Sequence, residues 1–86
     1  MYQETIVIQN KTGLHARPAS LLLELAQGFE SEVMLHTEDE EVNAKSIISI
    51  LAGGILPGTE VRLEVEGADE AEAGSAVARL LKTLPD

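Results

Sequence analysis

The sequence predicts an α+β fold in which a four-stranded antiparallel sheet lies under three helices. Two hydrophobic periods alternate along the chain: apolar residues at every second position, typical of strands, and apolar residues every three or four positions, typical of helices. The clearest strand spans residues 60–66, where Val61, Leu63 and Val65 alternate with charged residues. Such alternation indicates that one sheet face is exposed to water, so we expect the helices on the other face.

The first strand and the first helix are separated by turn residues. Residues 2–8 are rich in Thr, Ile and Val, which favours a strand. Residues 10–13 (Asn-Lys-Thr-Gly) are typical of a turn. Apolar side chains at helical spacing then predict a helix over residues 16–27 that ends at Gly28. Pro18 is compatible with this helix because it falls in the first turn, where no backbone N–H is needed.

A hairpin and a short helix follow. Residues 33–37 alternate again and predict a second strand. The acidic run 38–41 predicts a solvated hairpin connection that leads into a short strand around Val42. Ser46 precedes the apolar run 47–51, which predicts a short helix with Ser46 as its N-cap.

The last predicted element is a helix after the strand at 60–66. Gly67 ends that strand, and Asp69 with Glu72 three residues later resembles a capping box. The predicted inward face of the helix consists of aliphatic residues at helical spacing, namely Ala73, Val77, Leu80, Leu81 and Leu84. The element order is therefore βαββαβα.

The composition narrows the functional classes. The chain has 86 residues, which suits one domain over residues 1–86, and its formal net charge is −9. We therefore expect neither nucleic-acid binding nor a polybasic membrane patch. The absence of cysteine excludes disulfides and thiolate metal sites, and two histidines without ligand spacing predict no metal. No apolar run suits membrane insertion and the first residues do not resemble a signal peptide, so we expect a cytoplasmic protein.

His15 is the residue that most strongly suggests chemistry. It lies between a glycine turn and the start of the first predicted helix. The first N–H groups of a helix have no partner within it, and the helix dipole adds partial positive charge there, so this end attracts anions. Arg17 adds a fixed charge that suits phosphate oxygens. A neutral imidazole can bind near such an anion or attack phosphorus itself. On spacing alone, a surface histidine without a role is as good an interpretation.

Ser46 and the apolar residues after it are the second candidate. A serine at a helix start needs no explanation beyond capping, which is the favoured interpretation, but it could also be a regulatory phosphorylation site. A helix this short cannot bury Ile47, Ile48 and Leu51 together, so part of this group is predicted to be an exposed contact for a partner.

Two segments resemble a known family. Residues 13–19 (Gly-Leu-His-Ala-Arg-Pro-Ala) are similar to the phosphohistidine signature of the histidine-containing phosphocarrier (HPr) family of the bacterial phosphoenolpyruvate-dependent phosphotransferase system. Residues 43–48 (Asn-Ala-Lys-Ser-Ile-Ile) resemble its second, serine-centred signature. The resemblance covers residues 1–86 and implies an open-faced β-sandwich, a four-stranded antiparallel sheet covered on one face by three helices.

The resemblance also implies a function. His15 would accept a phosphoryl group on Nδ1 from phosphorylated enzyme I and pass it to the A domain of an enzyme II sugar permease. Ala16, Arg17 and Pro18 would bind the phosphate, and Ser46 would be the regulatory site of HPr kinase/phosphorylase. The partner interface would include Ser20 with the apolar residues Ile47, Ile48 and Leu51. The chain would be a monomeric phosphocarrier rather than a turnover enzyme, and would need no cofactor.

Some residues depart from the family pattern, and alternatives stay open. Many members surround the site with lysines, whereas this chain retains Lys45 and has other residues in such positions, namely Glu24, Gln27, Glu40 and Ser49. Acidic partners would consequently be attracted less strongly. The same His15 chemistry would also serve a nitrogen-system carrier or a dihydroxyacetone-kinase-linked HPr-like carrier. An anion-binding module that is never phosphorylated is the alternative from another class.

Overall fold

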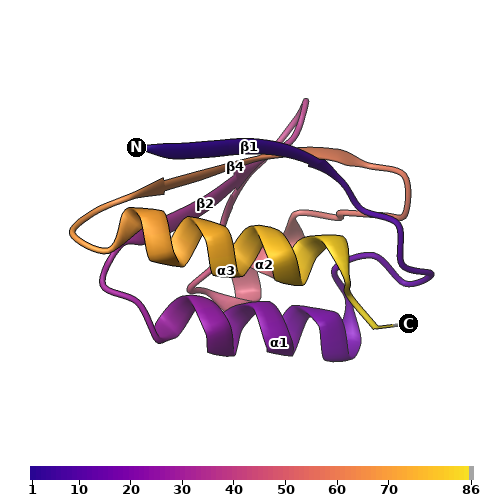
Figure 1. Cartoon of the computed structure of the whole chain (residues 1–86). Helices are drawn as coiled ribbons and strands as arrows, with labels where there is room; N and C mark the ends of the chain where they lie inside the picture. The colour runs from indigo at the N-terminus through magenta and orange to yellow at the C-terminus, as the bar shows by residue number, and fades with distance from the viewer. Residues whose placement is uncertain (86) are drawn as a thin grey trace.

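Three helices cover one face of a four-stranded antiparallel sheet in the computed structural model, which describes residues 1–85 (Figure 1). The elements are, in order, β1 (Tyr2–Val7), α1 (Ala16–Gln27), β2 (Glu32–His36), β3 (Glu41–Asn43), α2 (Ile47–Ala52), β4 (Glu60–Glu66) and α3 (Glu70–Lys82). The predicted fold class and the order βαββαβα are confirmed. The last residue of the predicted domain, Asp86, lies outside the described residues.

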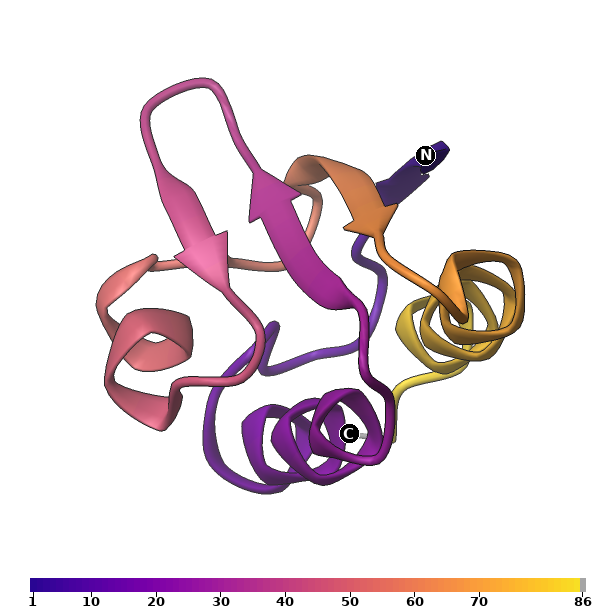
Figure 2. The same ribbon diagram turned by 90° about the vertical axis from the view of Figure 1, so that its left-hand side faces the viewer.

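The sheet order β1-β4-β2-β3 places the most regularly alternating strand, β4, between β1 and β2. In register, Leu63 lies between Glu4 of β1 and Leu35 of β2. Val61, Leu63 and Val65 are fully buried, while the alternating charged residues face the uncovered side. In Figure 2 the helices lie below the strands, all on one side of the sheet. The alternation seen in the sequence therefore indicates correctly which face of the sheet the helices cover.

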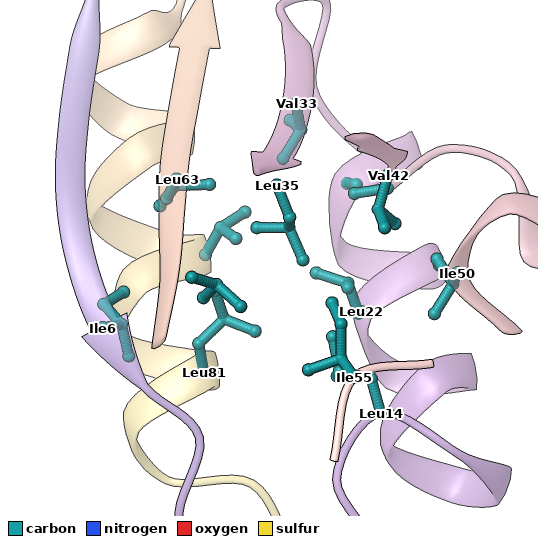
Figure 3. Close-up of a cluster of buried hydrophobic side chains, with 14 of the residues drawn as sticks. Ile6, Leu14, Leu22, Val33, Leu35, Val42, Ile50, Ile55, Leu63 and Leu81 are labelled. Atoms are coloured by element: carbon teal, nitrogen blue, oxygen red, sulfur yellow. The ribbon is translucent and has the colours of Figure 1, made fainter. Parts of the chain in front are cut away.

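The core between the sheet and the helices is aliphatic. Figure 3 shows side chains from β2, β4 and α1 meeting in it, among them Leu22, Leu35 and Leu63, all fully buried. Some core residues lie outside regular elements. Ile8 follows β1 and donates its N–H to the Thr59 carbonyl at 3.0 Å, and Ala44 and Leu84 follow β3 and α3. Within residues 1–85, no helix has the length and apolarity needed to cross a bilayer.

The first strand is joined to α3 by two contacts that the sequence pattern does not reveal. The Tyr2 ring lies against Gly74, where a Cβ atom would be 2.2 Å from the ring. The Tyr2 hydroxyl donates to Glu4 Oε1 at 2.6 Å, and Glu4 also pairs with Lys82 of α3. The Lys82 ammonium and the Tyr2 hydroxyl together lower the pKa of the Glu4 carboxyl. A glycine inside α3, normally unfavourable, is thus required by the ring that packs on it.

Asp69 does not form the predicted capping box. It is the N-cap residue of α3, but its side chain makes no cap hydrogen bond. Its carboxylate instead accepts from the backbone N–H groups of Glu30 and Ser31, both at 2.9 Å, and from the Ser31 hydroxyl at 2.5 Å. These three donors replace the local cap, so Asp69 joins the start of α3 to the segment between α1 and β2.

These bonds generate a pH-dependent prediction. The Ser31 hydroxyl, followed by the Glu30 N–H, lowers the pKa of the Asp69 carboxyl below its ordinary value of 3.8. The stabilisation is therefore complete above that value and is lost as the pH falls through the lower, folded-state pKa. We expect Asp69→Ala to lower the melting temperature at neutral pH by roughly 5 °C, and this difference to shrink in acid.

Thermal unfolding across a pH series measures this effect. Glu72→Ala is the matched control, because Glu72 is an exposed acid in the first turn of the same helix. An equal loss of stability in both variants at neutral pH, or a difference for Asp69→Ala that does not change with pH, would contradict the assignment.

Candidate functional site

His15 is the N-cap residue of α1, but its side chain does not cap the helix. Its backbone is extended, with φ −126° and ψ 162°, and its ring makes no cap hydrogen bond. The residue is half-buried. An N-cap residue usually uses a side-chain oxygen to accept from the first turn. Here the ring nitrogens are not used in that way, which leaves them available for other chemistry.

The turn before His15 is held in place by a contact with Ile55. The Leu14 N–H donates to the Ile55 carbonyl at 3.0 Å, and the Leu14 side chain is fully buried. Gly13 has φ +66°, and a Cβ atom there would lie 2.3 Å from the Ile55 oxygen. Figure 3 shows Leu14 and Ile55 together beside Leu22 of α1. The backbone before His15 therefore has no room for a side chain at position 13, and it cannot move freely.

The first turn of α1 offers a small set of hydrogen-bond donors. Helix geometry leaves its first N–H groups without partners inside the helix. Ala16 and Arg17 each supply one, but Pro18 has no N–H and is buried, so any role it has in phosphate binding is not as a donor. Ala16 has φ +53°, a left-handed conformation that is strained for a residue with a side chain.

Arg17 supplies the charge at this end of the helix. It is exposed, and among residues 1–85 no carboxylate pairs with it. The first turn of α1 contains no acidic residue. An anion beside His15 would thus meet the dipole of α1, two backbone donors and one guanidinium. These are the features that phosphate binding requires, and the predicted pair of His15 and Arg17 lies at the same helix end.

Ser46 is confirmed as the N-cap of α2, because its hydroxyl oxygen accepts from the Ser49 N–H at 3.2 Å. After it, Ile50 is buried, whereas the predicted interface residues Ile47, Ile48 and Leu51 are 36%, 77% and 45% exposed. The helices α1 and α2 pack side by side (Figure 2), and the remaining predicted interface residue, Ser20, is exposed on α1.

The sequence analysis missed one residue of this surface. Leu56 is 57% exposed and follows Ile55, whose carbonyl holds the turn before His15. In the sequence it is a single leucine before the Pro57-Gly58 turn, so no period marks it. Only the contact between two segments forty residues apart brings it close to the site.

Lys45, the family-type lysine that this chain retains, has a structural contact. Its Nζ donates to the Phe29 carbonyl at 2.7 Å, just beyond the end of α1. A cation at the C-terminal end of a helix interacts favourably with its dipole. This charge is therefore engaged at the opposite end of α1 from His15.

The second histidine and a large hollow lie elsewhere. His36 faces the uncovered side of the sheet, with Nε2 3.2 Å from Glu64 Oε1 and Nδ1 3.6 Å from Glu41 Oε1. A hollow of about 1230 Å³ lies between the β2–β3 hairpin and residues 52–60, and neither His15 nor Arg17 lines it. Residues 1–85 contain no cluster of three or more His, Asp or Glu side chains that could hold a metal ion.

Comparison with known proteins gives a consistent result. The profile of a family described as "PTS HPr component phosphorylation site" matches residues 2–83. Phosphocarrier protein HPr of Treponema pallidum is 43% identical over 82 residues, covering 95% of this chain and 93% of that protein. The structure of HPr-C-His from Thermoanaerobacter tengcongensis has a TM-score of 0.90 and 46% identity, covering 94% and 91% of the two chains. Bacillus subtilis Crh, a catabolite repression protein described as a dimer with a swapping domain, has a TM-score of 0.74 and 41% identity, covering 94% and 93%.

The strained residue at the site yields a prediction. Glycine adopts a positive φ without the steric cost that Ala16 bears, so Ala16→Gly is expected to raise the melting temperature by a few degrees. The control is Ala71→Gly in the first turn of α3, whose φ is not in the positive range, so there glycine should lower the melting temperature. Thermal unfolding of both variants checks this. A loss of stability in Ala16→Gly as large as in the control would contradict it.

Proposed function

The chain belongs to the HPr family of phosphocarrier proteins of the phosphotransferase system, and we propose that it carries a phosphoryl group on His15 between two protein partners. The donor is phosphorylated enzyme I, and the acceptor is the A domain of an enzyme II sugar permease. The observation that carries the proposal is a half-buried imidazole at the start of α1 that is not used for capping. Two residues later comes an exposed arginine that pairs with no carboxylate of residues 1–85.

The proposed step is an in-line exchange at phosphorus. The lone pair on Nδ1 of neutral His15 attacks the phosphoryl group of the donor, a new P–N bond forms, and the bond from phosphorus to the donor atom breaks. The reverse exchange with the acceptor releases His15 in its starting form. The transition state is loose, so positioning and charge stabilisation matter more than any covalent help from the protein.

The residues after His15 stabilise the charge on the phosphoryl oxygens in this proposal. The N–H groups of Ala16 and Arg17 donate to them, and the Arg17 guanidinium adds a charge-assisted bond. Pro18 holds the first turn in shape and donates nothing. A carrier must release what it holds, and one arginine with two amides binds a phosphoryl group less tightly than a metal centre would. This strength suits onward transfer.

The partner surface lies beside this site. We propose that Ser20 of α1 and the exposed residues Ile47, Ile48 and Leu51 of α2 form it, with Leu56 added at its edge. Both partners must bring their reacting residue to His15, so one apolar surface serves enzyme I and the A domain in turn. Exposed aliphatic side chains on neighbouring elements are typical of such contacts.

Ser46 is proposed as the regulatory site for HPr kinase/phosphorylase. A phosphate on its hydroxyl would place about two negative charges at the start of α2, next to the partner surface, and would repel a phosphorylated partner. The cap bond to Ser49 supports a structural role for the same hydroxyl. We further propose that residues 1–86 act as one domain, as a monomer and in the cytoplasm.

A regulatory carrier is the second candidate function. The likeness to Crh, a protein named for catabolite repression, favours a regulatory branch with different partners. A nitrogen-system or dihydroxyacetone-kinase-linked carrier would use the same His15 chemistry. Only the identity of the donor and the acceptor separates these alternatives.

Labelling from phosphoenolpyruvate and enzyme I tests the proposal. Wild type is expected to gain one acid-labile phosphoryl group, and His15→Ala is expected to gain none. His36→Gln is the matched control: it removes the other histidine, which lies on the uncovered sheet face, and should be labelled like wild type. Intact-mass spectrometry checks all three. Acid-labile label on His15→Ala, or none on wild type with several enzyme I sources, would refute the assignment.

The role of Arg17 is tested by transfer rates. We expect Arg17→Ala to slow transfer from phosphorylated enzyme I roughly tenfold or more, because a charge-assisted bond to the transferring group is lost. The melting temperature of this variant should not change, since the Arg17 side chain is exposed and pairs with no carboxylate in the described part of the chain. Arg79→Ala removes the same charge from the exposed face of α3 and should leave the rate unchanged. Equal rates for the two variants in quench-flow experiments would show that Arg17 takes no part.

A further inference from the structure

Asn10 is a buried polar residue between β1 and the site, and it contacts two distant parts of the chain. It is 7% exposed. Its side-chain Nδ2 lies 2.9 Å from the Gly13 carbonyl oxygen, 3.3 Å from Thr12 Oγ1 and 3.3 Å from the Pro85 carbonyl oxygen. In Figure 1 the segment that follows α3 runs toward the beginning of α1, in agreement with the contact to Pro85.

The chemistry of these partners fixes the orientation of the carboxamide. Carbonyl oxygens only accept, so the amino group must face Gly13 and Pro85, and a flipped amide would place Oδ1 against both. In the observed orientation Oδ1 is buried and has no hydrogen-bond partner within residues 1–85. An unpaired buried acceptor is unfavourable, so the contacts of the amino group must outweigh its cost.

The bond to Gly13 completes a clamp on a single peptide group. The Gly13 carbonyl and the Leu14 N–H belong to the same planar unit. Asn10 donates to the Gly13 carbonyl at 2.9 Å, and the Leu14 N–H donates to the Ile55 carbonyl at 3.0 Å. Holding both edges of the plane sets the direction in which the backbone enters His15. If only one of these two hydrogen bonds were present, the peptide plane could still rotate about it.

We propose that Asn10 is a positioning residue for His15, acting through the Gly13–Leu14 peptide and anchored to the end of the chain through Pro85. This inference rests on the proposed function of His15 as the phosphoryl carrier. Asn10 does not touch the phosphoryl group. It fixes the position of the His15 backbone, from which the imidazole extends. Transfer between proteins depends steeply on the placement of the reacting atom.

The substitution Asn10→Asp tests this with little change in shape. It replaces the donating amino group by an accepting oxygen that faces two carbonyls. Asn43→Asp is the matched control: Asn43 is exposed and uses its Oδ1 to accept from the Lys45 N–H at 2.9 Å, so the aspartate keeps the bond. If Asn10→Asp is too unstable to assay, Asn10→Ser replaces it, since a serine hydroxyl donates only one bond and is too short to span both carbonyls.

Two readouts, both taken well below the melting temperature, separate positioning from general stability. In the unphosphorylated protein, we expect the Asn10 variant to move the NMR resonances of the His15 ring nitrogens and of the Leu14, His15 and Ala16 amides, with those of α3 unmoved. In the transfer assay, its rate from phosphorylated enzyme I should fall roughly tenfold or more. Asn43→Asp should match wild type in both.

The outcomes distinguish the two proposals. If wild type is labelled and the Asn10 variant shows wild-type resonances and rate, the positioning role is overturned while the carrier function stands. If wild type is never labelled, the carrier function fails, and the resonances still decide whether Asn10 positions His15. A slower rate with unmoved His15 resonances would also overturn the inference, because the effect would not pass through the ring.

Discussion

The structure around the site depends on one backbone contact, the bond from the Leu14 N–H to the Ile55 carbonyl. It joins the segment after β1 to the segment before β4, which are about forty residues apart in the chain. The close approach explains why residue 13 has no side chain and why Leu14 can be fully buried. It also brings Leu56 to the edge of the surface formed by α1 and α2. Together with the Asn10 contacts and the buried side chains of α1, this bond fixes the start of α1 relative to the sheet.

Much of the fold follows from local pattern, and the exceptions share a cause. The bounds of α1 and β4 agree with the prediction because their apolar periods are long and regular. The position of His15 and Arg17 at a helix start follows from Gly13 and Pro18. Asp69 was predicted to cap its own helix, and the structure instead gives its carboxylate to Ser31, thirty-eight residues away. No local pattern contains that partner, so the capping interpretation was wrong for a physical reason.

The same limit applies to residues of the site. Asn10 reads as an ordinary turn residue in the sequence, because its contact with Pro85 spans seventy-five positions. Lys45 matches the family signature, yet its ammonium group donates a hydrogen bond to the Phe29 carbonyl. A residue type at a position can be predicted from sequence, but its hydrogen-bond partner often cannot. The chemistry of a site depends on those partners.

The distribution of charge separates the two faces of the molecule. Acidic residues gather on the uncovered sheet face and in the hairpin beside it, namely Glu32, Glu38, Asp39, Glu40, Glu41, Glu60, Glu64 and Glu66. The first turn of α1, in the helical layer, has none. A chain with a net charge of −9 can thus offer an anion a place where the nearby charge is positive. Overall charge is a poor guide to what such a protein binds.

The packing of the Tyr2 ring on Gly74 also constrains how this sequence can diverge. Any larger residue at position 74 would occupy space that the ring fills. A lineage can therefore gain a side chain at 74 only after the aromatic ring at 2 has been lost, whereas the opposite order passes through a protein that must distort. The residue types allowed at the two positions are therefore linked by the limited space between a strand and a helix.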